Sequence, residues 1–148
     1  MTTVAATLRS MASDSAYNHT GGWQFQGGPK MLELSKEVAQ HVFNAKKAII
    51  GGAGDASGLG AAWEWFTDPS QKPPRLKNSE FIALTNNGLY TSFNLINWIA
   101  VDQKYYAIGS GMNFAAGALA SGKSAYKAVE IAMKWDPSTN FQIYEYKL

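Results

Sequence analysis

The chain has 148 residues, a formal net charge of +2 and no cysteine. This length fits one domain spanning residues 1–148, and 46% hydrophobic residues can build a substantial core. The small net charge gives no reason to expect nucleic acid as a partner, and the missing cysteines exclude thiol nucleophiles, disulfides and thiolate metal sites. Charged residues make up only 16% of the chain, below the usual share of about a quarter, which suggests that neighbouring subunits cover part of the surface.

Membrane insertion and secretion are not expected. No apolar stretch approaches the roughly 18 residues that span a membrane, and the N-terminus lacks a basic segment followed by a long apolar run. We therefore expect a cytoplasmic protein without membrane partners.

The first third of the chain predicts short strands. Apolar runs, alternation of apolar and polar residues and Gly-Pro turns place them at residues 2–7, 9–13, 23–26, 30–34 and 46–50. A helix follows, because Leu59, Ala62, Trp63 and Phe66 share one face, and Pro69 ends it.

The second half predicts a hairpin, a strand, two helices and a closing strand. Asn87-Gly88 between the apolar runs 81–85 and 89–93 is a strong hairpin signal. Residues 104–108 predict a strand, residues 114–120 and 125–132 predict helices, and residues 141–146 a final strand. Blocks of antiparallel strands and helices indicate an α+β fold in which helices cover both outer faces of a pair of sheets.

The start of the chain offers a candidate nucleophile. Removal of Met1 would leave Thr2 with a hydroxyl and a free α-amine on one residue, and an amine with a pKa of about 7.7–8.0 can act as a general base. This pairing activates a hydroxyl without histidine, although many ordinary chains also begin Met-Thr.

Such a nucleophile needs polar partners, and the sequence supplies candidates. Lys30 could provide a cation, Asp14 a carboxylate that holds it, Gly51 a backbone N–H for an oxyanion, and Ser110 a hydroxyl near the amine. Each also has an ordinary explanation: a solvated lysine, a turn glycine or a helix N-cap serine.

The sequence argues against a phosphate-binding loop and against a metal site. Residues 117–124 match the phosphate-loop pattern G-x-x-x-x-G-K-[ST], but that motif requires a strand before the loop, whereas a helix is predicted there. His19 and His41 have no partner at metal-ligand spacing, so no metal site is expected.

The ordered motifs resemble the proteasome β-subunit family, including the bacterial peptidase HslV, within the N-terminal nucleophile (Ntn) hydrolases. The resemblance spans nearly the whole chain and is most specific in the Tyr-Ala-Ile-Gly-Ser-Gly block at 106–111. The other segments that carry it are Thr2-Thr3-Val4, Ala12-Ser13-Asp14, Pro29-Lys30, the Ile-Gly-Gly-Ala-Gly-Asp run at 50–55, and the helix at 128–132 followed by Asp136.

The resemblance implies a four-layer αββα sandwich of two antiparallel sheets and a threonine peptidase that needs no cofactor. Thr2 would be the nucleophile, with Lys30, Asp14, Gly51 and Ser110 in the roles given above. The remaining implied site residues are the late pair Asp136 and Thr139, and Ile49 and Ala53, which would line an apolar pocket that prefers apolar substrate residues.

The resemblance also implies peptide or unfolded-protein substrates and self-assembly into a ring. The chain is short for the family, and residues 67–79 replace a longer helical region, which puts ring size and docking of an ATP-dependent unfoldase in doubt. The alternative from another functional class is a non-catalytic structural subunit that keeps Met1.

Overall fold

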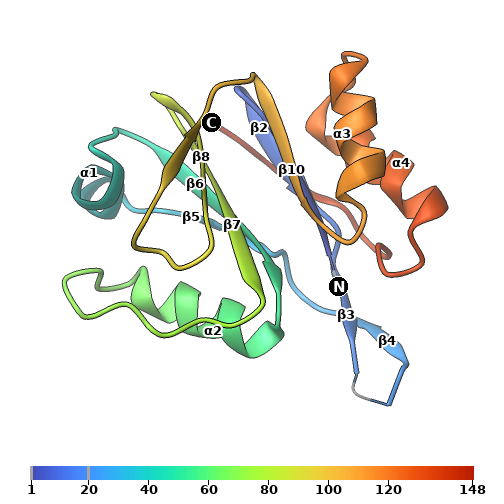
Figure 1. Ribbon diagram of the computed structural model, residues 1–148, viewed down its shortest axis with the longest axis horizontal. Coiled ribbons are helices and arrows are strands. Elements are labelled where there is room, and N and C mark those ends of the chain that lie inside the picture. The colour runs from blue at the N-terminus through green and yellow to red at the C-terminus, as the bar shows by residue number, and fades with distance from the viewer. Residues whose placement is uncertain (1, 20) are drawn as a thin grey trace.

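The computed structural model describes residues 2–19 and 21–148 (Figure 1). Met1, whose removal the proposed chemistry requires, therefore lies outside the described residues. Within the described part, no helix is long and apolar enough to cross a membrane.

The first sheet has four antiparallel strands in the order β10-β1-β2-β11. Their bounds are β1 (Thr3–Thr7), β2 (Ser10–Ser13), β10 (Tyr105–Gly109) and β11 (Tyr144–Lys147). The first strand, β1, and the last strand, β11, thus lie in one sheet. This arrangement brings the residues next to β11 close to the N-terminus.

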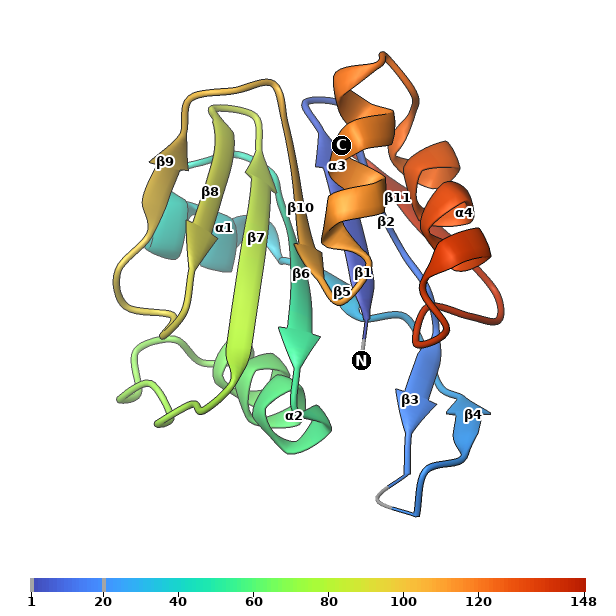
Figure 2. The ribbon, with the colours of Figure 1, turned by 45° about the vertical axis from the view of Figure 1, so that its right-hand side comes forward.

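The second sheet has five antiparallel strands in the order β5-β6-β7-β8-β9. They are β5 (Met31–Glu33), β6 (Ala48–Gly54), β7 (Ser79–Thr85), β8 (Gly88–Ser92) and β9 (Ile99–Val101). A separate hairpin of β3 (Ala16–Asn18) and β4 (Gln24–Gln26) projects from the body of the molecule (Figure 2).

Helices cover the outer face of each sheet. The helices α3 (Met112–Ala120) and α4 (Ala125–Trp135) lie on the first sheet, and α1 (Lys36–Phe43) and α2 (Ala56–Trp65) lie on the second (Figure 2). The structure confirms the predicted four-layer αββα sandwich.

The two-residue period of the strands divides their side chains between the layers. In β7, Ile82 and Leu84 pack between the sheets, whereas Phe81 and Ala83 pack against the layer of α1 and α2. The helices α3 and α4 contribute mainly alanines to their core, and small side chains allow helices to approach closely.

Three elements depart from the sequence-based expectations. Neither α1 nor the short strands β3 and β9 were predicted. The start of α1 does carry a local signal, because the Ser35 hydroxyl caps it by accepting the Val38 N–H at 3.2 Å.

The phosphate-loop alternative finds no support in the fold. The segment at 117–124 runs from α3 into the turn before α4, and Ser124 is the N-cap of α4. No strand feeds the segment, so it lacks the strand–loop–helix geometry that cradles phosphates.

Candidate active site

Thr2 lies immediately before β1 and is only 2% exposed. The chain approaches it closely at Gly109, which has φ +95, and a Cβ on Gly109 would stand 1.8 Å from the Thr2 carbonyl oxygen. Only glycine fits this position, because a side chain would clash and the left-handed backbone disfavours other residues. Sequence reasoning noted the Gly-Ser-Gly segment but not this requirement.

A buried ion pair lies beside the Thr2–Thr3 peptide. The Lys30 ammonium is 3.3 Å from Asp14 Oδ1, and the two side chains are 1% and 0% exposed. The same Asp14 oxygen accepts the backbone N–H of Thr3 at 3.0 Å. Lys30 also donates to the Ala16 carbonyl and lies 4.8 Å from the ring centroid of Tyr17.

The second oxygen of Asp14 holds two other segments of the chain. Asp14 Oδ2 accepts the N–H groups of Ala16 and Asn140, each at 3.2 Å. Asp14 thereby joins the N-terminal strand, the start of the hairpin and the segment before β11. Such a buried carboxylate satisfies several donors at once, as a buried charge requires.

Burial shifts both members of the pair toward their neutral forms. Desolvation raises the pKa of Asp14, although Lys30 and the three backbone N–H donors act in the opposite direction. Desolvation likewise lowers the pKa of Lys30 against the attraction of Asp14.

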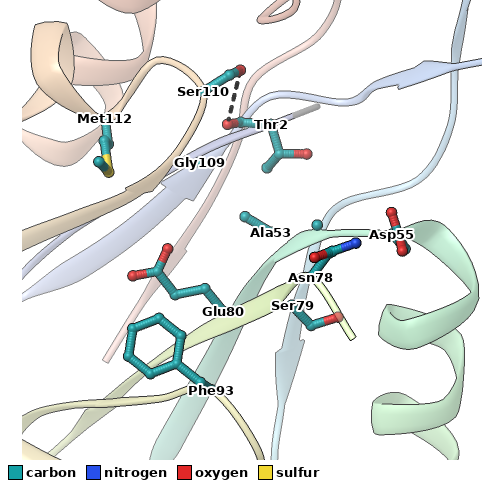
Figure 3. A pocket seen from close by; sticks show the side chains of 11 residues that line it. Thr2, Ala53, Asp55, Asn78, Ser79, Glu80, Phe93, Gly109, Ser110 and Met112 are labelled. Carbon is teal, nitrogen blue, oxygen red and sulfur yellow. Dashed lines mark hydrogen bonds between the residues drawn. The ribbon is translucent and has the colours of Figure 1, made fainter. Parts of the chain in front are cut away.

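A second polar network reaches the other side of Thr2. Asp136 Oδ2 accepts the hydroxyls of Ser110 and Thr139, both at 2.6 Å. The Thr139 proton is committed to Asp136, so Thr3 must be the donor in the 2.6 Å contact between Thr3 and Thr139. Ser110 Oγ also lies 3.5 Å from the Thr2 carbonyl oxygen (Figure 3).

These hydrogen bonds keep Asp136 ionised. Burial acts to raise its pKa, but the Ser110 and Thr139 hydroxyls and the Ser138 N–H outweigh that effect and lower it. The Ser110 proton points to Asp136, which leaves the oxygen lone pairs of Ser110 able to accept a hydrogen bond from a nearby amine.

A cavity of about 570 Å³ opens beside Thr2. Figure 3 shows the Thr2 side chain pointing toward Ala53, and Glu80, Phe93 and Met112 line the same pocket. The other lining residues are Gly54, Asp55, Asn78, Ser79, Gly109 and Ser110. The volume is within the range of ligand pockets, about 300–1,000 Å³.

The structure does not place every expected residue in this pocket. Ala53 lines it, but Ile49 is 1% exposed in the core between the sheets. Gly52 donates its N–H to the Lys30 carbonyl on the β5 side, and N–H directions alternate along a strand, so the Gly51 N–H points toward β7, where Gly51 pairs with Ile82. The expected roles of Ile49 and Gly51 therefore lack the required geometry.

Sequence reasoning missed several residues at this site, among them Gly109, Glu80 and Phe93. Gly109 gives the backbone approach described above, and Glu80 and Phe93 line the pocket. Glu80 lies in β7, and Phe93 directly follows β8. The sequence predicts only a hairpin of the sheet in this region, and no local pattern indicates that either side chain faces Thr2.

Comparisons with known proteins find likenesses in structure but not in sequence. No family model and no curated protein matches the sequence. BPH from Thiobacillus denitrificans, solved in complex with epoxomicin, gives a TM-score of 0.76 at 14% identity and covers 99% of this chain and 97% of its own. HslV from Trypanosoma brucei gives 0.66 at 17% identity, covering 99% and 98%.

A third solved structure is the helical assembly of the Anbu complex from Pseudomonas aeruginosa. It gives a TM-score of 0.72 at 10% identity and covers 99% of this chain and 80% of its own. Together with the αββα layers, these likenesses show that the chain has the fold of the proteasome-like N-terminal nucleophile hydrolases.

Proposed function

We propose that the protein is a threonine peptidase that hydrolyses peptide bonds through Thr2 after removal of Met1. The observation that supports this most directly is the position of Thr2. Its neighbour Thr3 connects through its N–H to the buried Lys30–Asp14 pair and through its hydroxyl to Thr139 of the Ser110–Asp136–Thr139 network, and Thr2 itself opens onto a pocket of about 570 Å³.

In the proposed reaction, Thr2 Oγ attacks the scissile carbonyl carbon while its proton passes to the Thr2 α-amine. The amine then gives the proton to the departing amine of the substrate, which leaves an ester on Thr2. A water molecule attacks this ester, with the α-amine again taking a proton, and hydrolysis releases the carboxylate product and restores Thr2.

The two networks have separate roles in this proposal. The positive charge of Lys30 stabilises the developing negative charge at Thr2 Oγ, and Asp14 holds the lysine in place. Ser110 accepts a hydrogen bond from the α-amine and orients its lone pair, while Asp136 and Thr139 fix the Ser110 hydroxyl.

We assign the oxyanion contact to Gly54 instead of Gly51. The Gly54 N–H points to the same edge of β6 as the Gly52 N–H. The ladder with β5 does not extend as far as Gly54, because Met31, the first residue of β5, pairs with Gly51. Gly54 also lines both cavities that include Thr2. Loss of such a donor costs about 2.7–4 kcal/mol in known hydrolases.

Self-assembly is part of the proposal. The Pseudomonas aeruginosa Anbu protein forms a helical assembly, and this chain exposes many large apolar side chains, including Trp135 at 67% and Ile96 at 63%. We propose a homo-oligomer, arranged as a ring, that encloses the Thr2 pocket, admits peptides or unfolded protein, and receives substrate from an ATP-dependent unfoldase.

Mass spectrometry and activity assays test the proposal together. The native protein should be lighter than the full sequence by one methionine, and epoxomicin, which BPH binds, should form an adduct with the wild type. Thr2→Ala should lower peptide turnover by about 10⁴-fold or more, the scale on which loss of a nucleophile acts, and should not react with epoxomicin.

A folded Thr2→Ala variant with unchanged turnover would contradict the mechanism. A native protein that retains Met1, binds no epoxomicin and cleaves no peptide would instead support the structural-subunit alternative. Circular dichroism and thermal unfolding of the variant provide the control for folding.

A further inference from the structure

A single carboxylate interrupts the otherwise apolar inner face of β7. Along this strand Glu80, Ile82 and Leu84 alternate with residues that face the helices, so Glu80 is on the side that faces the other sheet. Ile82 and Leu84 are fully buried there, whereas Glu80 is half-buried where the two sheets open into the Thr2 pocket.

Glu80 has no partner that compensates its charge. Within residues 2–19 and 21–148 its side chain makes neither a hydrogen bond nor an ion pair, and burial raises its pKa with no opposing charge. Neither cavity that includes Thr2 is lined by a described lysine, arginine or histidine, and Asp55 adds a second carboxylate at the rim. The described lining of these two cavities thus carries two carboxylates and no basic side chain.

The walls around Glu80 are apolar. Ala53 stands opposite Glu80 in the β6–β7 ladder, and Phe93 and Met112 line the same cavity at 58% and 43% exposure. An aliphatic stem fits against such walls, and a cation at its end gains from the carboxylate and from an aromatic face. Lysine and arginine have this combination of stem and charge.

We propose that Glu80 is a specificity-determining residue that selects a lysine or arginine at the substrate position preceding the scissile bond. This inference rests on the proposed peptidase function, and it replaces the apolar preference expected from Ile49 and Ala53. The side chain of the bound substrate residue enters the cavity beside Thr2, and its cation pairs with the Glu80 carboxylate.

Fluorogenic peptides that differ only at this position test the inference. Arginine and citrulline have nearly the same shape, but only arginine is charged, so the ratio of their kcat/KM values isolates the charge. We expect the wild type to favour arginine by about tenfold or more, Glu80→Gln to bring the ratio close to one, and Glu80→Lys to favour a glutamate substrate.

The matched control is Glu33→Gln, which removes the same charge from an exposed position in the same sheet, at a separate cavity. It should keep the wild-type ratio. Equal kcat/KM values for arginine and citrulline in the wild type, or an unchanged preference in Glu80→Gln, would overturn the inference while leaving the peptidase mechanism intact.

A binding measurement separates failure of this inference from failure of the proposed function. In the Thr2→Ala protein, acetyl-arginine methylamide should shift the Glu80 carboxyl resonance, and acetyl-citrulline methylamide should not. If no peptide is cleaved but this shift occurs, the peptidase function fails and the cation site stands. If neither compound shifts the resonance, the cation site fails.

Discussion

At the scale of single residues, burial determines how the polar groups around Thr2 behave. Lys30 reads in the sequence as an ordinary charged residue at a strand end, yet it is 1% exposed and bonded to a fully buried Asp14. A buried ion pair adds little net stability compared with an apolar pair. Its cost is consistent with a functional role, which we propose to be charge stabilisation at Thr2.

Asp136 gives a prediction about pH. Its folded pKa is lowered by the Ser110 and Thr139 hydroxyls and the Ser138 N–H, which outweigh its burial. Because the folded pKa lies below the unfolded value of about 3.9, the ionised form stabilises the fold above that pH. This contribution is lost as the pH falls below about 4 and through the folded pKa.

Urea unfolding of the wild type and Asp136→Asn between pH 2 and 7 measures this contribution. At pH 7 we expect the variant to be less stable by about 1–3 kcal/mol, because two hydroxyls lose a charged acceptor. The difference should shrink as the pH falls below about 4. A difference that stays constant over this range would show that the network stabilises the fold through packing alone.

At the scale of elements, glycines in different settings should respond in opposite ways to substitution by alanine. Gly109 ends β10 with φ +95 and faces the Thr2 carbonyl oxygen, so a Cβ has no room. Gly60 is an exposed interior residue of α2, and a Cβ there would have nothing within 4 Å.

We therefore expect Gly109→Ala to destabilise the protein by roughly 2–4 kcal/mol, from backbone strain and steric overlap. Gly60→Ala should stabilise it by about 0.5–1 kcal/mol, because alanine favours the helix. Denaturant midpoints of both variants check this pair. Equal effects at the two positions would contradict the close approach of β10 to Thr2.

At the scale of the whole molecule, the exposed apolar surface supports the proposed contact between copies of the chain. The β3–β4 hairpin projects from the body (Figure 2) and exposes Trp23 at 55% and Phe25 at 41%. A two-stranded hairpin is marginally stable alone in water, so burial of these rings against a second copy would stabilise it.

Light scattering of the purified protein should give the mass of an oligomer, that is, of two or more chains of 16.1 kDa. Trp23→Ser should weaken assembly by removing apolar area from the projecting hairpin. Leu8→Ser, which removes an apolar side chain exposed at 44% in the turn between β1 and β2, is the control. A wild-type monomer at high concentration would contradict the proposed oligomer.

The sequence by itself determined the layers of this protein. The spacing of Leu59, Ala62 and Phe66, the Asn87-Gly88 turn and the alternating strands are local patterns, and local patterns report which face of an element is buried. They were enough to predict two antiparallel sheets between helices, and the resemblance named Thr2, Asp14, Lys30 and Ser110 as residues that the fold brings to one place.

Only the tertiary structure decided which residues surround Thr2. The sequence expected Ile49, Ala53 and Gly51 there. The register of β6 between β5 and β7 keeps Ala53 at the pocket but brings Gly54 there and leaves Ile49 in the core, and the pairing of Ala53 with Glu80 adds the carboxylate. Register is set by contacts between strands far apart in the chain, and a shift of one residue turns every side chain to the opposite face. No local pattern carries that information.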